Sequence, residues 1–272
     1  MRAWCNGSLV DPAAPAIAPL DHGVTVGDGV FEAIKVTNGL PFALTRHLRR
    51  LARSATGLGL PEPDQDLLRT AVAEVLAGEP IELGRIRITF TGGIGPLGSG
   101  RSNGSPSYLV VVTDANEARS TTKAVTVPWT RNEQGALVGL KTTSYAENVM
   151  ALAYAEERDA TEAIFANTRG QLCEGTGTNV FCVFDGLVVT PPLDAGCLAG
   201  ITRELVIEWA DVDERALTMS ELAEADEVFL TSTTRDVQGL HQLDERTFAP
   251  EQPVTAQLQA LWQANEPRDI DP

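Results

Sequence analysis

The stretch NVFCVFDGLVVT, residues 179–190, constrains the fold more than any other part of the chain. Two runs rich in β-branched and aromatic residues flank Asp185-Gly186, a dipeptide that favours a tight two-residue turn. The stretch therefore predicts a β-hairpin. Apolar or alternating runs predict further strands at VFEAIKV (30–36), RIRITF (85–90), SYLVVV (107–112), EAIFAN (162–167) and EVFLTSTT (227–234), the last running into a hydroxyl-rich loop.

Helical patterns alternate with these strands. Thr45 is expected to cap a helix that Gly57 and Gly59 stop. Ser144 followed by Glu147 has the spacing of a capping box. Further helices are expected over residues 66–76, from residue 145 to about 158, and after Gly200. Mixed strands and helices in two portions favour an α+β protein over a doubly wound sheet.

The polar segment DANEARSTTK, residues 114–123, lacks periodicity and is the best candidate for an interdomain linker. We therefore expect a small N-terminal α+β domain at residues 1–118 and a larger C-terminal domain at residues 119–272. A hydrophobic content of 43% is sufficient for well-packed cores in both.

Composition excludes several classes of partner. A net charge of −16 repels nucleic acids and anionic membrane surfaces, so an anionic ligand must be bound by local donors. No segment has the pattern of a signal peptide or the apolar length of a membrane span, which predicts a cytoplasmic protein. No metal site or disulfide framework is expected, because the four cysteines form no CxxC motif and have no nearby histidine pair; they are predicted to be small buried apolar residues.

Two loops offer groups suited to a phosphate. A glycine-led helix start at residues 200–202 exposes main-chain N–H groups, and hydroxyl groups follow a strand end at residues 232–234. Ordinary capping and turn chemistry is the alternative for each loop, since such segments are common. The candidate residues are Gly200, Ile201, Thr202, Ser232 and Thr233.

His47 and Arg50 are three residues apart on the first expected helix and project from one side of it. An arginine there could bind a phosphate through two N–H groups. The alternative is a solvated basic face shared with Arg46, Arg49 and Arg53, because runs of charge usually face water.

Lys141 and Glu174 are candidates for chemistry. Lys141 follows GALVGL, an apolar and glycine-rich segment typical of a strand end. Its amine would therefore be partly desolvated, which lowers the pKa of a lysine and exposes a neutral, nucleophilic amine. Glu174 lies in QLCEGTGTNVF, where small residues let a cofactor approach closely and a carboxylate could hold a proton on a ring nitrogen. A solvated lysine and a turn acid are the alternatives.

These segments occur in an order that resembles one known family. DHGVTVGDGVFEAIKV, LTRHLRRL, LKTTSYAENV, EAIFAN, QLCEGTGTNVF, CLAGITRELVIE and EVFLTSTT resemble class IV aminotransferases, the pyridoxal-phosphate enzymes of fold type IV, from about Asp21 to Leu240. That family includes D-amino acid and branched-chain aminotransferases and aminodeoxychorismate lyase. The resemblance implies two α/β-type domains with pyridoxal 5'-phosphate between them, the C-terminal one being the cofactor-binding domain. It also implies amino acid and 2-oxo acid substrates and a homodimer.

The resemblance assigns a role to each candidate. Lys141 matches the lysine that binds the cofactor aldehyde covalently and moves the α-proton, Arg50 matches the arginine on the phosphate, and Glu174 matches the glutamate facing the pyridine nitrogen. Further matches are Gly200, Ile201 and Thr202 at the phosphate-binding helix start, Ser232 and Thr233 at the last phosphate contact, Tyr145 at the ring border and Glu162 near the lysine. His47 is a candidate contact for the substrate or for the residues around it.

Within the family, GDGVFEAIKV, GITRELVIE and LTSTT are most similar to D-amino acid aminotransferases, which implies amino transfer between a D-amino acid and a 2-oxo acid. Two features depart from that pattern. Phe31 replaces the usual tyrosine, and GGIGPLGSGR lacks the arginine and histidine that usually bind the substrate carboxylate. Lys35, Arg101 and Arg131 are the candidates for that contact.

Other functions stay open at this point. Aminodeoxychorismate lyase uses the same lysine to eliminate pyruvate and release 4-aminobenzoate, and Phe31 and RNEQGALVGLK favour it. The arginine and tyrosine of that enzyme's glycine-rich loop are, however, missing between Gly92 and Gly100. A branched-chain or R-amine aminotransferase is the next alternative. A non-catalytic cofactor-binding protein is disfavoured because Lys141 and Glu174 are both present.

Overall fold

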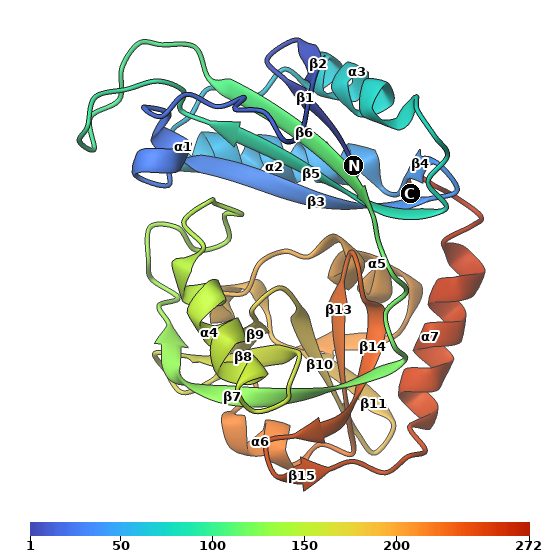
Figure 1. Cartoon of the computed structure of the whole chain (residues 1–272). Helices are drawn as coiled ribbons and strands as arrows, with labels where there is room; N and C mark the ends of the chain where they lie inside the picture. The colour runs from blue at the N-terminus through green and yellow to red at the C-terminus, as the bar shows by residue number, and fades with distance from the viewer. The chain divides into compact units, whose positions relative to one another are not determined.

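A computed structural model describes residues 1–272, and the chain forms two compact units (Figure 1). The N-terminal unit consists of Met1–Glu117, Leu140–Ser144 and Asp269–Pro272, and the C-terminal unit consists of Ala118–Gly139 and Tyr145–Arg268. This division differs in two places from the one expected after residue 118. The short segment that carries the candidate lysine and the C-terminal end of the chain both belong to the N-terminal unit.

An antiparallel six-stranded sheet is the frame of the N-terminal unit, with the strand order β2-β1-β6-β5-β3-β4. The pairing of β3 with β5 runs from Gly29 opposite Thr91 to Thr37 opposite Leu83. The elements of this unit are β1 (Arg2–Cys5), β2 (Ser8–Val10), α1 (His22–Thr25), β3 (Gly29–Thr37), β4 (Leu40–Pro41), α2 (Leu44–Leu58), α3 (Gln65–Leu76), β5 (Leu83–Thr91) and β6 (Ser107–Asp114).

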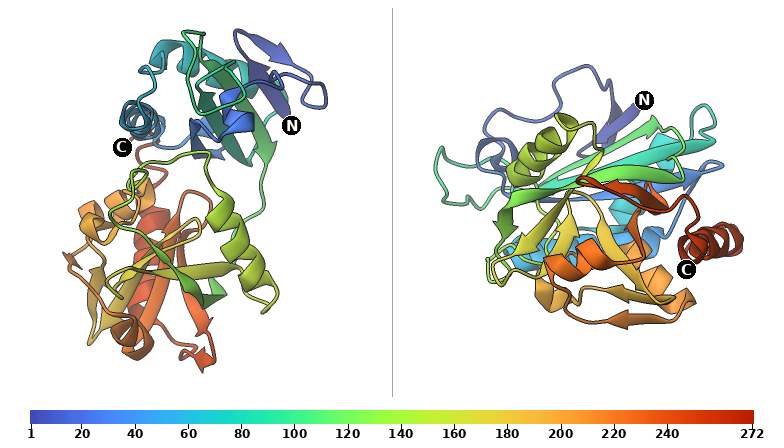
Figure 2. Two further views of the ribbon diagram at one scale, coloured as in Figure 1. Left: turned by 90° about the vertical axis from the view of Figure 1, so that its left-hand side faces the viewer. Right: turned by 90° about the horizontal axis from the view of Figure 1, so that it is seen from below.

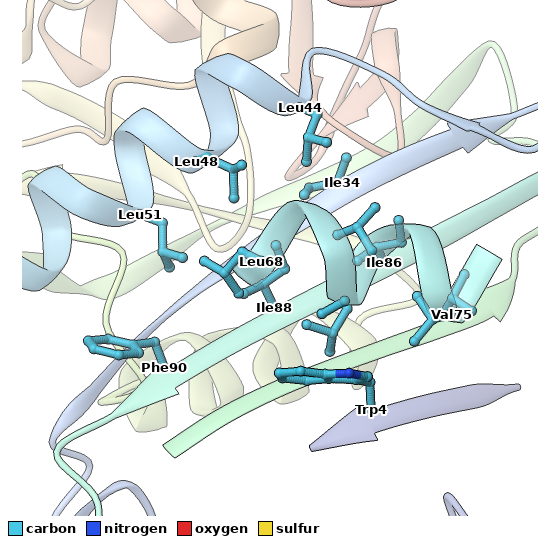
Figure 3. Packing of buried hydrophobic residues seen from close by; sticks show 14 of the residues in the cluster. Trp4, Ile34, Leu44, Leu48, Leu51, Leu68, Val75, Ile86, Ile88 and Phe90 are labelled. Atoms are coloured by element: carbon cyan, nitrogen blue, oxygen red, sulfur yellow. The ribbon is translucent and has the colours of Figure 1, made fainter. Parts of the chain in front are cut away.

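Side-chain alternation divides this sheet into two faces. Even-numbered residues of β3, β5 and β6 pack against α2 and α3, whose apolar sides bury Leu48, Leu51 and Leu68 (Figure 3). Full burial of each such leucine contributes roughly 1.5–3 kcal/mol. Odd-numbered residues of the same strands, among them Phe31 and Arg87, lie on the opposite face.

A nine-stranded sheet is the frame of the C-terminal unit, with the order β12-β11-β10-β13-β14-β7-β8-β9 and β15 paired to β14. Parallel pairs flank β7 on both sides, and β10, β13 and β14 pair antiparallel. The elements are β7 (Thr121–Arg131), α4 (Ala146–Glu156), β8 (Glu162–Asn167), β9 (Leu172–Gly175), β10 (Asn179–Phe184), β11 (Leu187–Thr190), the 3₁₀ turn η1 (Leu193–Ala195), α5 (Ile201–Trp209), β12 (Val212–Glu214), α6 (Met219–Glu224), β13 (Glu227–Ser232), β14 (Asp236–Leu243), β15 (Arg246–Thr247) and α7 (Pro253–Asn265).

This second sheet curls. β9 stands at one end of the strand order, yet only residues 176–178 separate it from β10, near the other end. The inner side of the curl buries one apolar cluster that includes Ile164, Val180, Leu230 and Leu240. Helices cover the outer side: α4 packs on β7 and β8, and α7 lies along β13 and β14 (Figure 2).

The sequence patterns correctly predicted the strands β3, β5, β6, β8, β10, β11 and β13 and the helices α2 to α5, and they did not predict the other elements. The expected hairpin is β10 and β11, and its turn residues Asp185 and Gly186 have φ values of 49° and 82°. Both values lie in the left-handed region that a two-residue hairpin turn requires. The four cysteines are free and buried, as expected. None of the helices combines the length and apolarity needed to cross a membrane.

The two predicted N-caps are wrong. The Thr45 hydroxyl donates to the Asp271 carboxylate. α2 begins at Leu44, one residue before Thr45, and its N-cap residue Ala43 provides no side-chain cap. The Ser144 hydroxyl donates to the Gly27 carbonyl oxygen at 3.1 Å, so no capping box forms with Glu147. In both cases a residue distant in the sequence competes successfully for the hydroxyl group.

Candidate active site

The main chain around Lys141 lies beside the start of β3. The Phe31 N–H donates to the Lys141 carbonyl oxygen at 2.9 Å, and the Thr143 N–H donates to the Gly29 carbonyl oxygen at 2.8 Å. The Lys141 N–H donates to Ser54 Oγ on α2 at 3.1 Å. Main-chain bonds therefore set the position from which the lysine side chain starts.

The segment before Lys141 does not form the strand end that the sequence predicted. β7 ends at Arg131, and residues 132–140 form turns in which Gly139 adopts a φ of 73°, where glycine is favoured. The lysine residue is half-buried, and its Nζ lies 4.5 Å from the centroid of the Phe31 ring. The amine therefore faces an aromatic ring that displaces part of its water.

Arg50 and His47 are buried on α2, so the interpretation of a solvated basic face is wrong for both. They converge on Glu32 of β3, which is 0% exposed. Glu32 accepts bonds from Arg50 Nε at 2.8 Å, from Arg50 Nη2 at 2.6 Å and from His47 Nδ1 at 2.7 Å. On the same helix, Arg49 and Arg53 are exposed. The forked pair fixes the plane of the Arg50 guanidinium group.

This cluster has defined protonation states. Burial by itself raises the pKa of Glu32, but the charge and hydrogen bonds of Arg50, together with His47, outweigh it and lower that pKa to about 2. Burial lowers the pKa of His47, and the charges of Arg50 and Lys141 lower it further, against the opposing effect of Glu32. Sequence reasoning missed Glu32, although an acid inside the mostly apolar run VFEAIKV was a usable signal.

Glu174, on β9, is oriented by a main-chain N–H and an arginine. Its Oε2 accepts a bond from the Leu198 N–H at 2.9 Å, and its Oε1 lies 3.4 Å from Arg131 Nε. Arg131 also donates to Glu147 Oε2 and Asn148 Oδ1, each at 2.8 Å. The guanidinium proposed from the sequence as a substrate contact thus belongs to a polar network around Glu174. A carboxylate placed in this way can accept a hydrogen bond from a ring N–H.

Tyr145, Asn148 and Glu162 all hold the turn that follows Glu174. The Tyr145 hydroxyl donates to the Thr176 carbonyl oxygen at 3.0 Å, and Asn148 Nδ2 donates to the same oxygen. Glu162, 2% exposed, accepts bonds from the Thr176 N–H at 2.8 Å and from the Thr176 hydroxyl. The Glu162 carboxylate therefore stabilises the main chain beside Glu174.

The start of α5 leaves its first main-chain N–H groups without a side-chain cap. Gly200 is the N-cap residue and provides no side-chain cap, so the helix begins with main-chain N–H groups at Ile201 and Thr202. A Cβ atom at position 200 would lie 2.0 Å from Asn179 Oδ1, which makes glycine necessary here. Asn179 is fixed in turn, because its Nδ2 donates to the Leu198 carbonyl oxygen at 2.8 Å.

The register between β10 and β13 links the hydroxyl-rich loop to Asn179, the residue beside Gly200. Asn179, whose side chain lies beside Gly200, pairs with Thr231 on β13, and Ser232 and Thr233 follow Thr231 in the chain. The side-chain oxygens of Thr178 and Thr231 are buried and have no hydrogen-bond partner. Helix-start N–H groups, nearby hydroxyls and these two orphaned oxygens fit an oxygen-rich phosphate group.

Arg101 is engaged within the N-terminal unit. Its Nε and Nη2 donate to the Asp28 carboxylate at 2.7 and 2.6 Å. Its remaining contacts are the carbonyl oxygens of Gly59 and Leu58, each at 2.8 Å. The hydrogen bonds that Arg101 donates to Asp28 raise the pKa of Arg101. These contacts anchor the glycine-rich loop and occupy most of the donors that a substrate carboxylate would need. Lys35 lies on β3, half-buried, on the odd-numbered face.

The structure gathers the candidates into one group in each unit. The N-terminal group holds the lysine above Phe31, close to the buried arginine and histidine of α2. The C-terminal group has two parts, the turn after Glu174 and the end of the sheet where α5 begins. An amine, a helix start with main-chain N–H groups and a carboxylate are thus present, and these are the kinds of group that a phosphorylated pyridine aldehyde requires.

Comparison with known proteins identifies the family. The profile of amino-transferase class IV matches residues 29–243. A provisionally named branched-chain-amino-acid aminotransferase from Methanocaldococcus jannaschii is 32% identical, covering 91% of this chain and 90% of that protein. The D-alanine aminotransferase of Bacillus licheniformis is 30% identical, covering 97% of this chain and 96% of that protein. The chain belongs to the class IV aminotransferases.

Solved structures agree with fold type IV. A fold IV transaminase from Curtobacterium pusillum has a TM-score of 0.85 at 34% identity, covering 96% of this chain and 92% of that one. A branched-chain aminotransferase from Thermoproteus uzoniensis has a TM-score of 0.91 at 30% identity, covering 97% and 93%. The pyridoxal-phosphate-bound form of a hypothetical aminotransferase from Mycobacterium tuberculosis has a TM-score of 0.87 at 28% identity, covering 97% and 98%. Enzymes of this family depend on pyridoxal 5'-phosphate.

Proposed function

We propose that this aminotransferase moves an amino group between a D-amino acid and a 2-oxo acid. The observation that supports an amino acid substrate is the position of the Lys141 amine above Phe31, on a sheet face where Lys35 and Arg87 supply positive charge for a carboxylate. The preference for D-amino acids is supported by the motifs GDGVFEAIKV, GITRELVIE and LTSTT and by the match along 96% of a D-alanine aminotransferase.

Separate groups of residues would hold the two ends of the cofactor. Arg50, oriented by Glu32, and the N–H groups at the start of α5 would bind the phosphate, with Ser232 and Thr233 adding hydroxyls. Glu174 would accept a bond from the protonated ring nitrogen. When bound, pyridoxal phosphate supplies a ring that withdraws electrons from the reacting carbon.

Lys141 would have two tasks. Its Nζ would hold the cofactor through its aldehyde until a substrate amine takes that place. The released Nζ would then take the proton from the α-carbon as a general base and return it as a general acid. The main-chain bonds of Lys141 to Phe31 and Ser54 keep the root of this side chain in place, and an error of about 1 Å can reduce a rate by roughly a hundredfold.

A branched-chain amino acid aminotransferase is the second candidate, because the relative from Methanocaldococcus jannaschii and the structure from Thermoproteus uzoniensis carry that name. Aminodeoxychorismate lyase, the alternative from the sequence, would use the same Lys141. It differs in an observable way, since it releases 4-aminobenzoate and needs no amino acceptor.

The test compares three substrates on one preparation of the enzyme loaded with pyridoxal phosphate. D-alanine with 2-oxoglutarate, L-leucine with 2-oxoglutarate, and aminodeoxychorismate alone are supplied separately. We expect pyruvate and glutamate from D-alanine, at a rate at least roughly tenfold above that of L-leucine, and no 4-aminobenzoate. Lys141→Ala is the control, folded by circular dichroism and inactive. Turnover confined to L-leucine or to aminodeoxychorismate would overturn the proposal, and an active Lys141→Ala variant would overturn the role of the lysine.

A further inference from the structure

One face of the N-terminal sheet carries positive charge in a chain whose net charge is −16. β3 and β5 place Ala33 opposite Arg87 and Lys35 opposite Arg85, so these side chains share the odd-numbered face with Phe31. No aspartate or glutamate occupies an odd-numbered position of β3, β5 or β6. A local group of cations that opposes the charge of the whole chain indicates an anionic ligand.

Phe31 places one of these cations next to the lysine. The Arg87 guanidinium carbon lies 3.8 Å from the centroid of the Phe31 ring, and Lys141 Nζ lies 4.5 Å from the same centroid. Contact with one ring limits the separation of the two cations to about 8 Å. The ring is 3% exposed and therefore fixed, whereas the Arg87 residue is exposed and accessible to a ligand.

We propose that Arg87 binds the α-carboxylate of the substrate, an inference that rests on the proposed amino acid substrate. In an amino acid the carboxylate carbon lies about 2.5 Å from the amine nitrogen. A charge-assisted N–H···O bond adds about 2.8 Å. The two lengths add to about 5 Å. An amine held at the atom bonded by Lys141 therefore places its carboxylate within reach of a cation that lies no more than about 8 Å from Lys141 Nζ.

The chemistry of the other residues on this face favours Arg87. Phe31 stands where the family pattern has tyrosine, and a phenylalanine ring donates no hydrogen bond to a carboxylate. Arg101 donates most of its N–H groups to Asp28 and to main-chain oxygens. Arg85 lies two residues farther along β5, roughly 7 Å from Arg87 along the strand. Stacking on Phe31 orients the flat Arg87 group, so less rotamer freedom is lost when it binds a carboxylate.

The experiment uses the pyridoxal-phosphate-loaded enzyme without a 2-oxo acid, so that each probe gives one spectral change of the cofactor. D-alanine is titrated against isopropylamine, in which a methyl group replaces the carboxylate. For Arg87→Gln we expect half-saturation by D-alanine to rise by roughly 10- to 150-fold, the loss of hydrogen bonds to a charged group. The limiting rate of the spectral change should alter far less, because this contact is made before and during the reaction. Half-saturation by isopropylamine should stay within about threefold of wild type.

Arg85→Gln is the matched control, since it removes the same charge from the same strand face and should leave D-alanine half-saturation within about threefold. Arg87→Lys, which keeps the charge but not the fork, should fall between wild type and Arg87→Gln. Equal D-alanine half-saturation in wild type and Arg87→Gln, or an equal weakening by Arg85→Gln, would overturn the inference alone. A wild-type enzyme whose cofactor spectrum responds to no amino acid would overturn the proposed function, and this inference with it.

Discussion

At the residue scale, the position of Arg50 depends on an acid that the sequence pattern did not assign. The family motif predicted Arg50 as a phosphate contact. The buried position of Arg50, however, requires the ionised Glu32 to which it donates hydrogen bonds. Two buried charges are stable together only when each satisfies the other, because desolvating either one alone costs several kcal/mol. Glu32 is therefore a positioning residue for the phosphate contact proposed for Arg50. A helical pattern cannot show such a partner, since it lies on a different element.

Glu32→Gln should destabilise the protein in a pH-dependent way. Removing the carboxylate leaves Arg50 buried without its counter-ion, so the free energy of unfolding in urea at pH 7 should fall by roughly 3 kcal/mol. The pKa of Glu32 is lowered to about 2 in the folded protein, so the stability contributed by Glu32 is present above pH 4.5 and is lost as the pH falls toward 2. The difference between wild type and variant should therefore shrink over that interval.

Glu82→Gln, at an exposed position, is the control and should follow wild type at every pH. A constant difference between Glu32→Gln and wild type from pH 7 to pH 3 would contradict the assignment of a strongly lowered pKa to Glu32.

At the element scale, periodicity predicted strands and helices well but predicted their ends poorly. β3, β5, β8 and the hairpin of β10 and β11 follow from alternation and from Asp185-Gly186, which are local signals. The hydroxyls of Thr45 and Ser144 bond to Asp271 and Gly27 instead of capping their own helices. The hydroxyl of a residue at a helix end can bond to partners anywhere in the fold. The local sequence therefore predicts where a helix begins only in part.

Gly200→Ala should weaken cofactor binding more than it weakens the fold. The new Cβ atom would meet Asn179 Oδ1 at 2.0 Å, and relief of this clash must shift the first turn of α5 away from the hydroxyl-rich loop. We expect the dissociation constant of pyridoxal phosphate, measured by absorbance titration, to rise by roughly tenfold or more, the loss of one hydrogen bond to a charged group. Gly98→Ala, where no atom lies within 4 Å of the added Cβ, should bind the cofactor like wild type. Equal affinities in the two variants would rule out this role of the helix start.

At the scale of the whole molecule, the sequence predicted a mixed α+β protein of fold type IV and its family, and the comparisons confirm both. It did not predict that residues 140–144 belong to the N-terminal unit while their neighbours on both sides belong to the C-terminal unit. That placement depends on hydrogen bonds from the main chain of this segment to Phe31, Gly29 and the Ser54 side chain, which lie about 87 to 114 residues away in sequence. Contacts of this range have no signature in local composition.

We expect a homodimer in solution. The family resemblance implies one, and two neighbouring apolar side chains on α4 are exposed, Val149 at 65% and Met150 at 58%. Light scattering should give about twice the chain mass of 29.0 kDa. Val149→Glu should shift the mass toward that of one chain if this surface is the contact, whereas Leu187→Glu, a change at another exposed apolar residue, should not. A mass of one chain for active wild-type protein would contradict the expectation.

The strict alternation of β3 and β5 has a consequence for evolution and for protein engineering. Odd-numbered positions such as 33, 35, 85 and 87 turn away from the packed side, and each of their neighbours in sequence points into it. Chemical diversity introduced at those positions alone would leave the volume of the core untouched. Variant libraries restricted to this set should therefore yield new selectivities with little loss of folded protein, a separation that helices with their mixed faces rarely offer.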